Sequence, residues 1–294
     1  VDIDPQTYNL CLDALMTKLA RADQAGRLPK VLVAVHLCGQ PCDVAAIYKL
    51  SQQYGFRIIE DASHATGGKY KGEFIGNGRY SDITVFSFHP VKIVTTAEGG
   101  MALTNDDKLA SRMNLLRSHG ITRDQSLMTH EPDGPWYYQQ VELGYNYRMT
   151  ELQAALGISQ MDRLDAFVAR RHELAQRYDE LLKDLPVITP WQHPDSYSGL
   201  HLYVIRLQLG AITKTHRQVF ESLREQGIGV NLHYIPVHIQ PYYQQMGFEP
   251  QGFPQAMQYY GEAISLPMFQ GLTDEQQDDV VQALKIALDV GRHR

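Results

Sequence analysis

The stretch KVLVAVHLCGQPCDVAAIYKLSQQYGFRIIE, residues 30–60, decides the fold class of this chain. It opens with an apolar, β-branched run at 30–36, which predicts a strand buried on both faces of a parallel sheet. Residues 43–54 then carry apolar side chains at helical spacing, with Asp43 as the expected N-cap. A second apolar run follows at 57–60. Strand, helix and strand in this order predict an α/β sheet.

The same alternation continues along the rest of the chain. Further strands are expected at 82–88, 100–104, 201–209, 229–232 and 263–266, and helices at 105–117, 150–185, 213–226 and 273–288. Thr150 is a candidate cap for the helix at 150–185. We expect a large domain over residues 1–170, with a mainly parallel sheet flanked by helices, and a smaller C-terminal α/β domain over residues 171–294. Ligands of such sheets gather at the carboxyl ends of the strands, so polar residues there are the candidates for a functional site.

Composition and charge exclude several classes of protein. The 294 residues include 27 Lys and Arg against 33 Asp and Glu, a net charge of −6, which is a poor match to the basic face of a nucleic-acid binder. No apolar run approaches the roughly 20 residues that a membrane helix needs. Three cysteines are too few for a disulfide scaffold and indicate a reducing, cytoplasmic compartment. His36, Cys38 and Cys42 have metal-like spacing but lack a fourth ligand nearby, so no metal site is predicted.

The segment SDITVFSFHPVKIVTTAEGG, residues 81–100, carries the most informative lysine. Lys92 follows an expected buried strand and precedes a turn rich in hydroxyl groups and glycine, so we expect it at a strand end. That position partly desolvates an amine, as a lysine that forms a Schiff base requires. A solvated surface charge is the alternative. Ser87 is a candidate donor to a cofactor phosphate, or else a satisfied strand hydroxyl.

Asp61 follows the neighbouring strand and gives Lys92 a chemical partner. Pyridoxal phosphate works as an electron sink only when its pyridine nitrogen stays protonated, and a protein carboxylate supplies the counter-charge. Asp61 and Lys92 on adjacent strand ends, facing the two sides of a flat cofactor, therefore predict a pyridoxal-phosphate site. His64 is expected to touch the ring or its phenolic oxygen. An ordinary strand boundary for Asp61 and a packed loop histidine for His64 are the alternatives.

Two further segments hold candidate substrate contacts. LGYNYRMTE, residues 143–151, places Asn146 and Arg148 just before a helix, whose N-terminus favours anions, although a capping loop is the alternative. GVNLHYIPVHIQPYY, residues 229–243, is a dense polar and aromatic loop that suits sugars and uracil rings, or else a packed loop of Tyr and Pro. The candidate contacts in this loop are Asn231, His233 and Tyr234.

Several strings of the sequence resemble a known family. They are EDASHATGGKYKG, DITVFSFHPVKIVTTAEGGM, LRSHGI, LGYNYRMTELQAALGISQMDRLD, VNLHYIPVHIQPYY and ISLPMF followed by GLTDEQ, and they are similar to the DegT-type sugar aminotransferases. The resemblance extends over essentially the whole chain, and SFHPVK with TTAEGG and LHYIPVH are specific strings. It implies the aspartate-aminotransferase fold and pyridoxal 5'-phosphate as the cofactor.

The resemblance also implies a role for each matching residue. Lys92 matches the lysine that binds the cofactor covalently and then carries the proton between substrate carbon and cofactor. Asp61 matches the acid that pairs with the pyridine nitrogen. His64 falls beside the cofactor ring, and Ser87 matches a hydroxyl near the phosphate. Asn146 matches a residue that reaches the neighbouring subunit's site, which implies a homodimer with shared active sites.

The implied reaction joins an amino donor and a nucleotide sugar. The amino group would pass from L-glutamate to the 4-keto carbon of a UDP-4-keto-6-deoxy-N-acetyl-hexosamine, in biosynthesis of the pseudaminic acid type, as used for flagellin and cell-surface polysaccharides. The residues from Asn231 to Tyr234 match a stretch that contacts the nucleotide sugar. A pyridoxal-phosphate-dependent sugar dehydratase, in which His typically replaces the lysine, and a non-catalytic sensor or structural relative are the alternatives. Lys92 favours transamination.

The start of the chain raises one further expectation. Family members are usually longer, so the resemblance implies that an N-terminal part of the large domain is absent and that residues 1–5 correspond to a strand within that domain. The absent part would hold some of the phosphate contacts. A chain of this extent is therefore expected to bind its cofactor weakly or not at all.

Overall fold

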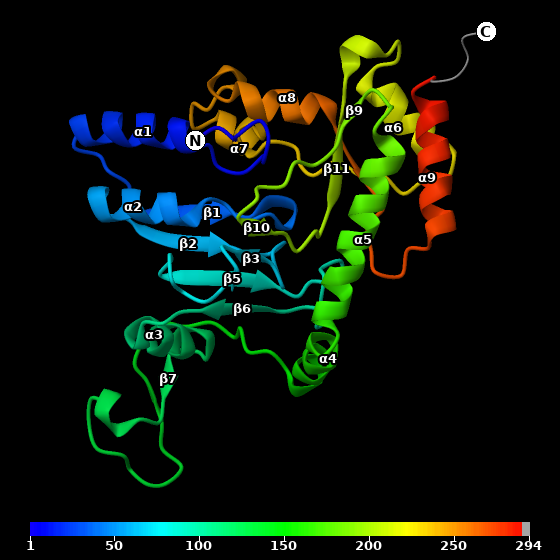
Figure 1. Cartoon of the computed structure of the whole chain (residues 1–294). Helices are drawn as coiled ribbons and strands as arrows, with labels where there is room; N and C mark the ends of the chain where they lie inside the picture. The colour runs from blue at the N-terminus through cyan, green and yellow to red at the C-terminus, as the bar shows by residue number, and fades with distance from the viewer. Residues whose placement is uncertain (290–294) are drawn as a thin grey trace.

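A four-stranded sheet organises the first half of the computed structural model, which describes residues 1–289 (Figure 1). Its strands are β1 (Val31–Val35), β2 (Arg57–Asp61), β5 (Ile83–Ser87) and β6 (Gly100–Leu103), in the order β1-β2-β5-β6. β1, β2 and β5 run parallel, and β6 is antiparallel to β5. The mainly parallel sheet predicted from the sequence is therefore confirmed.

Helices α1 (Leu12–Gln24) and α2 (Val44–Tyr54) cover one face of this sheet. The Asp43 side chain accepts a hydrogen bond from the Ala46 N–H and caps α2, as predicted. The side chains that form this core are Leu15, Leu19, Leu32, Ala34, Ile47 and Ile58.

Strand β1 alternates between buried and exposed residues, so the prediction that it is buried on both faces is wrong. Val31, Val33 and Val35 are 47%, 52% and 43% exposed, while Leu32 and Ala34 are buried against α1 and α2. The apolar run reads as doubly buried because all five residues are apolar, but α1 and α2 pack on only one side of them.

The C-terminal half is built on a second, antiparallel sheet. Its strands follow the order β12 (Ala263–Leu266), β11 (Tyr203–Leu207) and β9 (Val187–Ile188). Helices α5 (Leu164–Leu182), α6 (His216–Glu225) and α9 (Asp274–Ala287) contribute to its core. The core side chains include Leu174, Tyr178, Ile205, Leu223, Ile264 and Leu284. The expected strand at 229–232 is wrong, because Asn231 makes only an isolated bridge to Ser265.

The helix expected over 150–185 is two helices, α4 (Glu151–Met161) and α5, which meet at Asp162 and Arg163. Thr150 caps α4 through a reciprocal pair of bonds with Gln153, as predicted. None of the residues of α4 is buried, whereas α5 packs Leu174, Tyr178 and other side chains into the C-terminal core. Only α5 packs against the C-terminal core, so the chain changes direction between the two helices. The predicted domain boundary at residue 170 falls inside α5 and stays a prediction.

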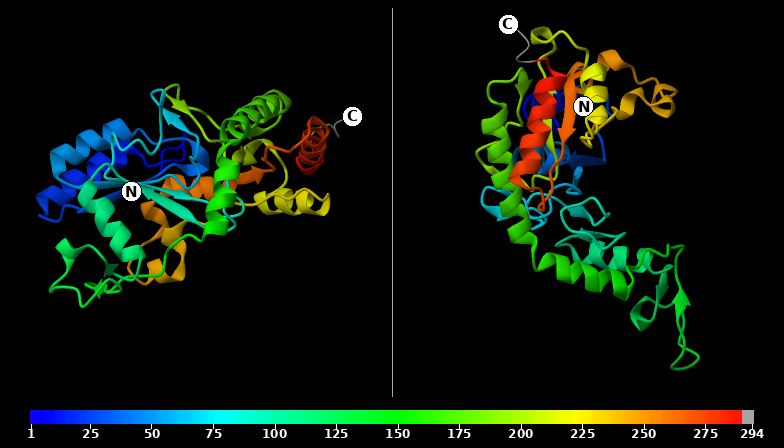
Figure 2. Two further views of the ribbon diagram at one scale, coloured as in Figure 1. Left: turned by 90° about the horizontal axis from the view of Figure 1, so that it is seen from below. Right: turned by 90° about the vertical axis from the view of Figure 1, so that its right-hand side faces the viewer.

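Shorter elements complete the described chain. They are α3 (Asp107–Arg117), α7 (Pro241–Gln244), α8 (Pro254–Glu262), β3 (Lys69–Tyr70), β4 (Glu73–Phe74), β7 (Ile121–Thr122), β8 (Gln139–Gln140) and β10 (Ser196–Tyr197), with 3-10 turns at Leu37–Gly39, Gln125–Leu127, Leu209–Ala211, Val237–Ile239 and Pro250–Gly252. The segment from α3 to α4 extends away from both sheets (Figure 2). Residues 1–5 contain one bridge, from Ile3 to Leu10, and not the strand expected there. Within residues 1–289, no helix has the length and apolar character needed to cross a membrane.

Candidate active site

Asp61 and Lys92 follow the carboxyl ends of two adjacent parallel strands. Asp61 is the last residue of β2 and pairs with Val85 on β5, and Lys92 lies in the turn that begins where β5 ends at Ser87. The Asp61 Oδ1 atom accepts hydrogen bonds from the Ser63 N–H at 3.1 Å and the Ser63 hydroxyl at 2.5 Å. Ser63 thereby fixes the orientation of the carboxylate at this edge of the sheet.

The environment of Lys92 favours its neutral amine. Burial lowers the pKa of Lys92, and the negative charge of Asp61 opposes this without reversing it. A larger fraction of the amine is therefore unprotonated near neutral pH than for a solvated lysine, which is the condition for attack on a carbonyl carbon. The effect of Asp61 on Lys92 also indicates that the two side chains share one electrostatic environment.

His64 is buried beside these two residues and holds a defined tautomer. Its Nδ1 atom accepts a hydrogen bond from the Cys38 N–H at 3.3 Å, so the proton of the neutral ring is on Nε2. Nε2 lies 3.3 Å from the Tyr234 hydroxyl oxygen. Burial first, and then the charge of Lys92, lower the pKa of His64 to about 4. His64 is therefore an uncharged hydrogen-bond donor at physiological pH.

His233 and Tyr234 reach this place from the C-terminal half of the chain. The His233 Nδ1 atom lies 2.7 Å from the Ser265 hydroxyl, and the His233 carbonyl accepts a hydrogen bond from the Tyr259 hydroxyl at 2.7 Å. The Tyr234 ring is 50% exposed, so it is accessible to a ligand. The charge of Lys92 acts on His64 and His233, and the charge of Asp61 acts on His64 and Tyr234. The structure thus brings these predicted site residues together.

Ser87 and Asn231 make local contacts at the edge of this group. The Ser87 hydroxyl oxygen accepts a hydrogen bond of 3.4 Å from the His89 N–H, at the start of the Lys92 turn. The exposed Asn231 side chain accepts a 2.8 Å bond from the N–H of its neighbour Leu232. Ser87 therefore lies close in sequence and space to Lys92, whereas the Asn231 side chain bonds only to the adjacent backbone among the described residues.

Asn146 and Arg148 lie in the exposed loop before α4. The Asn146 Oδ1 atom accepts bonds of 3.3–3.4 Å from the Arg148 guanidinium, which also lies 3.4 Å from the His119 ring. Arg148 lines a cavity of about 780 Å³ together with Glu98 and Gly99, in the turn that follows Lys92. These two side chains are thus near the far end of that turn and make no hydrogen bond to Lys92 or Asp61 within residues 1–289.

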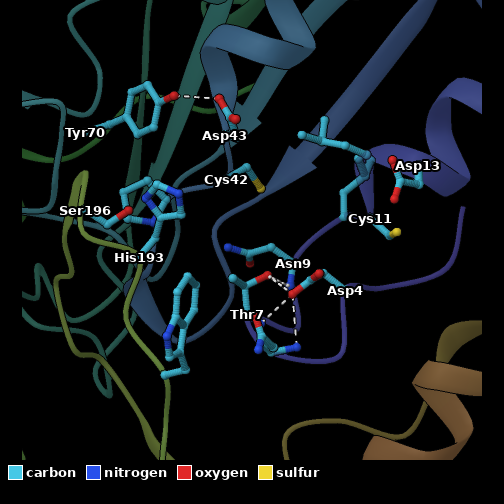
Figure 3. Close-up of a pocket in the computed structure, with 15 residues that line it drawn as sticks. Asp4, Thr7, Asn9, Cys11, Asp13, Cys42, Asp43, Tyr70, His193 and Ser196 are labelled. Carbon is cyan, nitrogen blue, oxygen red and sulfur yellow. Dashed lines mark hydrogen bonds between the residues drawn. The ribbon is translucent and has the colours of Figure 1, made fainter.

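Another cavity, of about 350 Å³, lies beside the N-terminal loop and α2 (Figure 3). Its lining includes Asp43, Tyr70, Trp191 and His193, and the Tyr70 hydroxyl donates a 2.5 Å bond to Asp43. The residues around Lys92 do not line it. Sequence analysis did not identify this cavity, because its walls come from segments far apart in the chain.

The residues with metal-like spacing have structural partners instead. The His36 Nδ1 atom accepts a bond from the Cys42 N–H at 3.1 Å, and its Nε2 atom lies 2.8 Å from the Glu60 carboxylate. Cys38 and Cys42 are free thiols. In the part of the chain that the structure describes, no group of three or more His, Cys, Asp or Glu side chains is arranged to hold a metal ion.

Sequence reasoning missed three contributors to the site, which are Ser63, Cys38 and His201. Ser63 stands two residues after Asp61 and had a local signal, since a hydroxyl at this spacing commonly bonds an aspartate. Cys38 contributes through its backbone, and the ring of His201 lies 4.5 Å from that of His64 across a long sequence separation. Neither of these two leaves a pattern in the local sequence.

Comparison with known proteins gives the family. Residues 1–285 match the model of the DegT/DnrJ/EryC1/StrS aminotransferase family. The chain is 38% identical over 287 residues to the spore coat polysaccharide biosynthesis protein SpsC of Bacillus subtilis, covering 97% of this chain and 72% of SpsC. The chain is also 36% identical over 287 residues to MJ1066, an uncharacterized protein of Methanocaldococcus jannaschii, covering 97% of this chain and 72% of MJ1066.

Solved structures match the fold as well. Helicobacter pylori PseC, described as an aminotransferase involved in the biosynthesis of pseudoaminic acid, superposes with a TM-score of 0.87 at 29% identity, covering 98% of this chain and 73% of PseC. The PMP-form of the putative sugar aminotransferase Spr1654 of Streptococcus pneumoniae gives 0.85 at 29% identity, covering 98% and 75%. The architecture is thus that of these aminotransferases, and the chain belongs to the DegT/DnrJ/EryC1/StrS aminotransferase family.

Proposed function

We propose that this chain is a pyridoxal-phosphate-dependent aminotransferase that moves an amino group from L-glutamate to the 4-keto carbon of a UDP-4-keto-6-deoxy-N-acetyl-hexosamine. The observation that carries the proposal is the position of Asp61 and Lys92 after adjacent parallel strands, with the neutral His64 beside them. Family membership supports aminotransfer. The likeness to PseC supports a sugar of the pseudaminic acid type.

The residues present fit the cofactor. Pyridoxal phosphate withdraws electrons from the substrate carbon when its ring nitrogen is protonated. Asp61 is held by Ser63 through one oxygen, Oδ1, so its charge is fixed in direction and suits a protonated ring nitrogen. Lys92 has the lowered pKa that covalent attachment requires. The structures of Spr1654 include a PLP-form and a PMP-form, which supports the same cofactor here.

Each remaining residue has a proposed task in this reaction. The Nζ atom of Lys92 would hold the cofactor and would move the proton at the substrate carbon. His64 would lie beside the ring of the bound cofactor, and because its imidazole is uncharged it would add no full positive charge there. Ser87 contacts the phosphate. The exposed ring of Tyr234 and the imidazole of His233 contact the nucleotide sugar, with Asn231 at the outer edge of the same loop.

We further propose that two copies of the chain form a dimer with shared active sites. Large apolar side chains are exposed along the segment from β8 to α4, and a monomer rarely leaves so many uncovered in one region. Their exposed fractions are 84% for Leu143, 73% for Tyr147, 85% for Leu152 and 67% for Ile158. Asn146 and Arg148 lie within this segment, so pairing of two copies would bring them toward the partner subunit's site.

Absorbance of the purified protein tests the proposal. Protein supplied with pyridoxal phosphate is expected to show a band above about 400 nm from the lysine-bound cofactor, and Lys92→Ala is expected to abolish it. L-Glutamate, the proposed amino donor, is expected to bleach the band. A dehydratase needs no amino donor, so this bleaching separates the two activities. Lys108, an exposed lysine on α3, gives the matched control, and Lys108→Ala should leave the band unchanged. Because weak cofactor binding is expected, the band is measured at saturating pyridoxal phosphate, and its absence there in the unaltered protein would contradict the proposed function and favour a non-catalytic relative.

A further inference from the structure

His201 lies just before β11. The sequence predicts a strand at this position and no functional role for the histidine. Its backbone neighbours are attached to the loop that follows β1. The Gly199 N–H donates to the Gly39 carbonyl at 3.0 Å, and the Leu202 N–H donates to the Cys38 carbonyl at 3.3 Å. Cys38 is also the residue whose N–H bonds to His64. The same short loop therefore positions both histidines.

Arg171 on α5 holds the other side of this segment. The guanidinium is buried, and its Nη1 atom donates to the carbonyls of Leu200 at 3.0 Å, His201 at 3.2 Å and Met268 at 3.1 Å. The two N–H groups of this nitrogen, one of them shared between two carbonyls, hold the backbone of His201 against α5. The position of the His201 ring is thus set from two sides.

The ring of His201 packs on the face of the His64 ring. The two centroids are 4.5 Å apart with an interplanar angle of 46°, and the residues are 5% and 7% exposed. The nitrogens of His64 are already engaged by Cys38 at Nδ1 and Tyr234 at Nε2. The Tyr234 ring is also stacked on His64 with centroids 6.2 Å apart, so His201 provides the closer of two ring contacts. The Nδ1 atom of His201 is buried and has no partner among the described residues. His201 therefore contributes a packing surface at this contact and no hydrogen bond from that nitrogen.

The surrounding charges keep this surface neutral. Lys92, Asp61 and His233 act on His64, and Lys92, Arg171, His64 and His233 act on His201. Burial first, and then the neighbouring basic groups, lower the pKa of His201 to about 2. Because the His201 ring is uncharged, it packs against His64 without electrostatic repulsion from Lys92 or from His64.

We propose that His201 is a positioning residue, whose ring packs against the face of His64 and holds the Nε2–H of His64 toward Tyr234 in the active site. The significance of this role rests on the proposed function. The geometry from which it is inferred does not, because it involves only contacts within the chain. Loss of the ring should release the plane of His64, and replacement by another flat ring should retain it.

Side-chain NMR of protein labelled with 15N-histidine tests the proposal without cofactor. In the unaltered protein, His64 is expected as the Nε2–H tautomer with a pKa of about 4. His201→Ala opens the ring face to water, so the pKa of His64 should rise by about one unit or more and both tautomers should appear. His201→Phe should keep the signals of the unaltered protein. If His201→Ala fails to fold, His201→Leu fills the space without a flat ring and is expected to release the plane of the His64 ring, so that both tautomers appear.

A second histidine provides the matched control. The His172 ring stacks on Tyr197 with centroids 4.1 Å apart, and its Nε2 atom lies 2.8 Å from the Ser198 carbonyl, outside the active site. His172→Ala should lower the melting temperature and leave the His64 signals unchanged. The proposal is overturned if removing the His201 ring leaves the tautomer and pKa of His64 as they were, if His201→Phe changes them as His201→Ala does, or if His172→Ala changes them equally. Glutamate bleaching of the cofactor band is measured separately, so failure of the proposed function remains distinguishable.

Discussion

The buried pair of His36 and Glu60 supports the end of β2 that carries Asp61. Breaking this pair is predicted to lower the free energy of unfolding. The Glu60 carboxylate is 4% exposed and receives hydrogen bonds from the Ser81 and Thr84 hydroxyls and from His36. Because the Cys42 N–H donates to Nδ1 of His36, the ring carries its proton on Nε2 and donates it to Glu60. His36 is therefore one of three donors that hold the buried Glu60 carboxylate next to Asp61.

The magnitude follows from the groups that lose a partner. His36→Leu removes a hydrogen bond to a charged group, worth about 1.5–3 kcal/mol, and leaves the buried Cys42 N–H unpaired at a cost of about 1–3 kcal/mol. Together we expect a loss of about 3–5 kcal/mol in the free energy of unfolding, the usual range for breaking a buried pair. The exposed pair of Arg57 and Asp82 is the control, and Arg57→Leu should cost less than about 1 kcal/mol.

The second substitution tests the cause. In the unaltered protein Glu60→Gln removes a buried charge that three hydrogen-bond donors stabilise, and it should destabilise by about 1–2 kcal/mol. In the His36→Leu background the same change removes a buried anion that has lost its His36 donor, so it should stabilise by at least about 1 kcal/mol. Urea denaturation at pH 7 measures all four proteins, with the slope of the transition checked for constancy. If Glu60→Gln destabilises both backgrounds equally, the two side chains are not coupled as described and the reasoning is refuted.

Three further predictions address the site and the surface. A Cβ at Gly99 would overlap Thr96, so Gly99→Ala should cost about 1–3 kcal/mol and weaken cofactor binding, measured by denaturation and by absorbance titration. The pKa of buried His64 is about 4 against an ordinary 6.5, so the folded protein is at no disadvantage from this group above pH 6.5 and loses stability as the pH falls below it. Between pH 7.5 and 5 the free energy of unfolding should fall by about 2 kcal/mol through His64 alone. His64→Gln should flatten that pH dependence. Leu152→Asp should convert the proposed dimer to monomer in sedimentation, whereas Ile286→Asp, on an exposed face of α9, should not.

Local sequence features predicted the elements that depend on local interactions. Asp43 and Thr150 cap their helices through their own side chains, and both were predicted from residue type and position. The end of β2 at Asp61 and the turn after β5 that holds Lys92 followed from short apolar runs, because in a parallel sheet neighbouring strands end at the same edge. These residues needed no knowledge of distant contacts.

Errors arose where packing between distant segments decides the outcome. The break between α4 and α5 contains neither Gly nor Pro, so no local residue indicates it, and it reflects the core that only α5 enters. The expected strand at 229–232 has apolar character, yet it is reduced to one bridge between Asn231 and Ser265. His201 supports His64 from more than a hundred residues away, which periodicity cannot reveal.

Close backbone packing at Gly39 and Gly199 explains why the two sheets meet at His64. Gly39 has a φ of +105°, and a Cβ there would lie 2.7 Å from the Leu200 nitrogen and 2.8 Å from the His64 carbonyl oxygen. Gly199 approaches that same oxygen, and a Cβ on it would lie 3.1 Å away. The loop after β1, the loop after β2 and the segment before β11 are thus in backbone contact, which side chains at these positions would prevent. Since the neutral donor of the proposed active site depends on all three segments, two glycines without any chemical role bring its parts together.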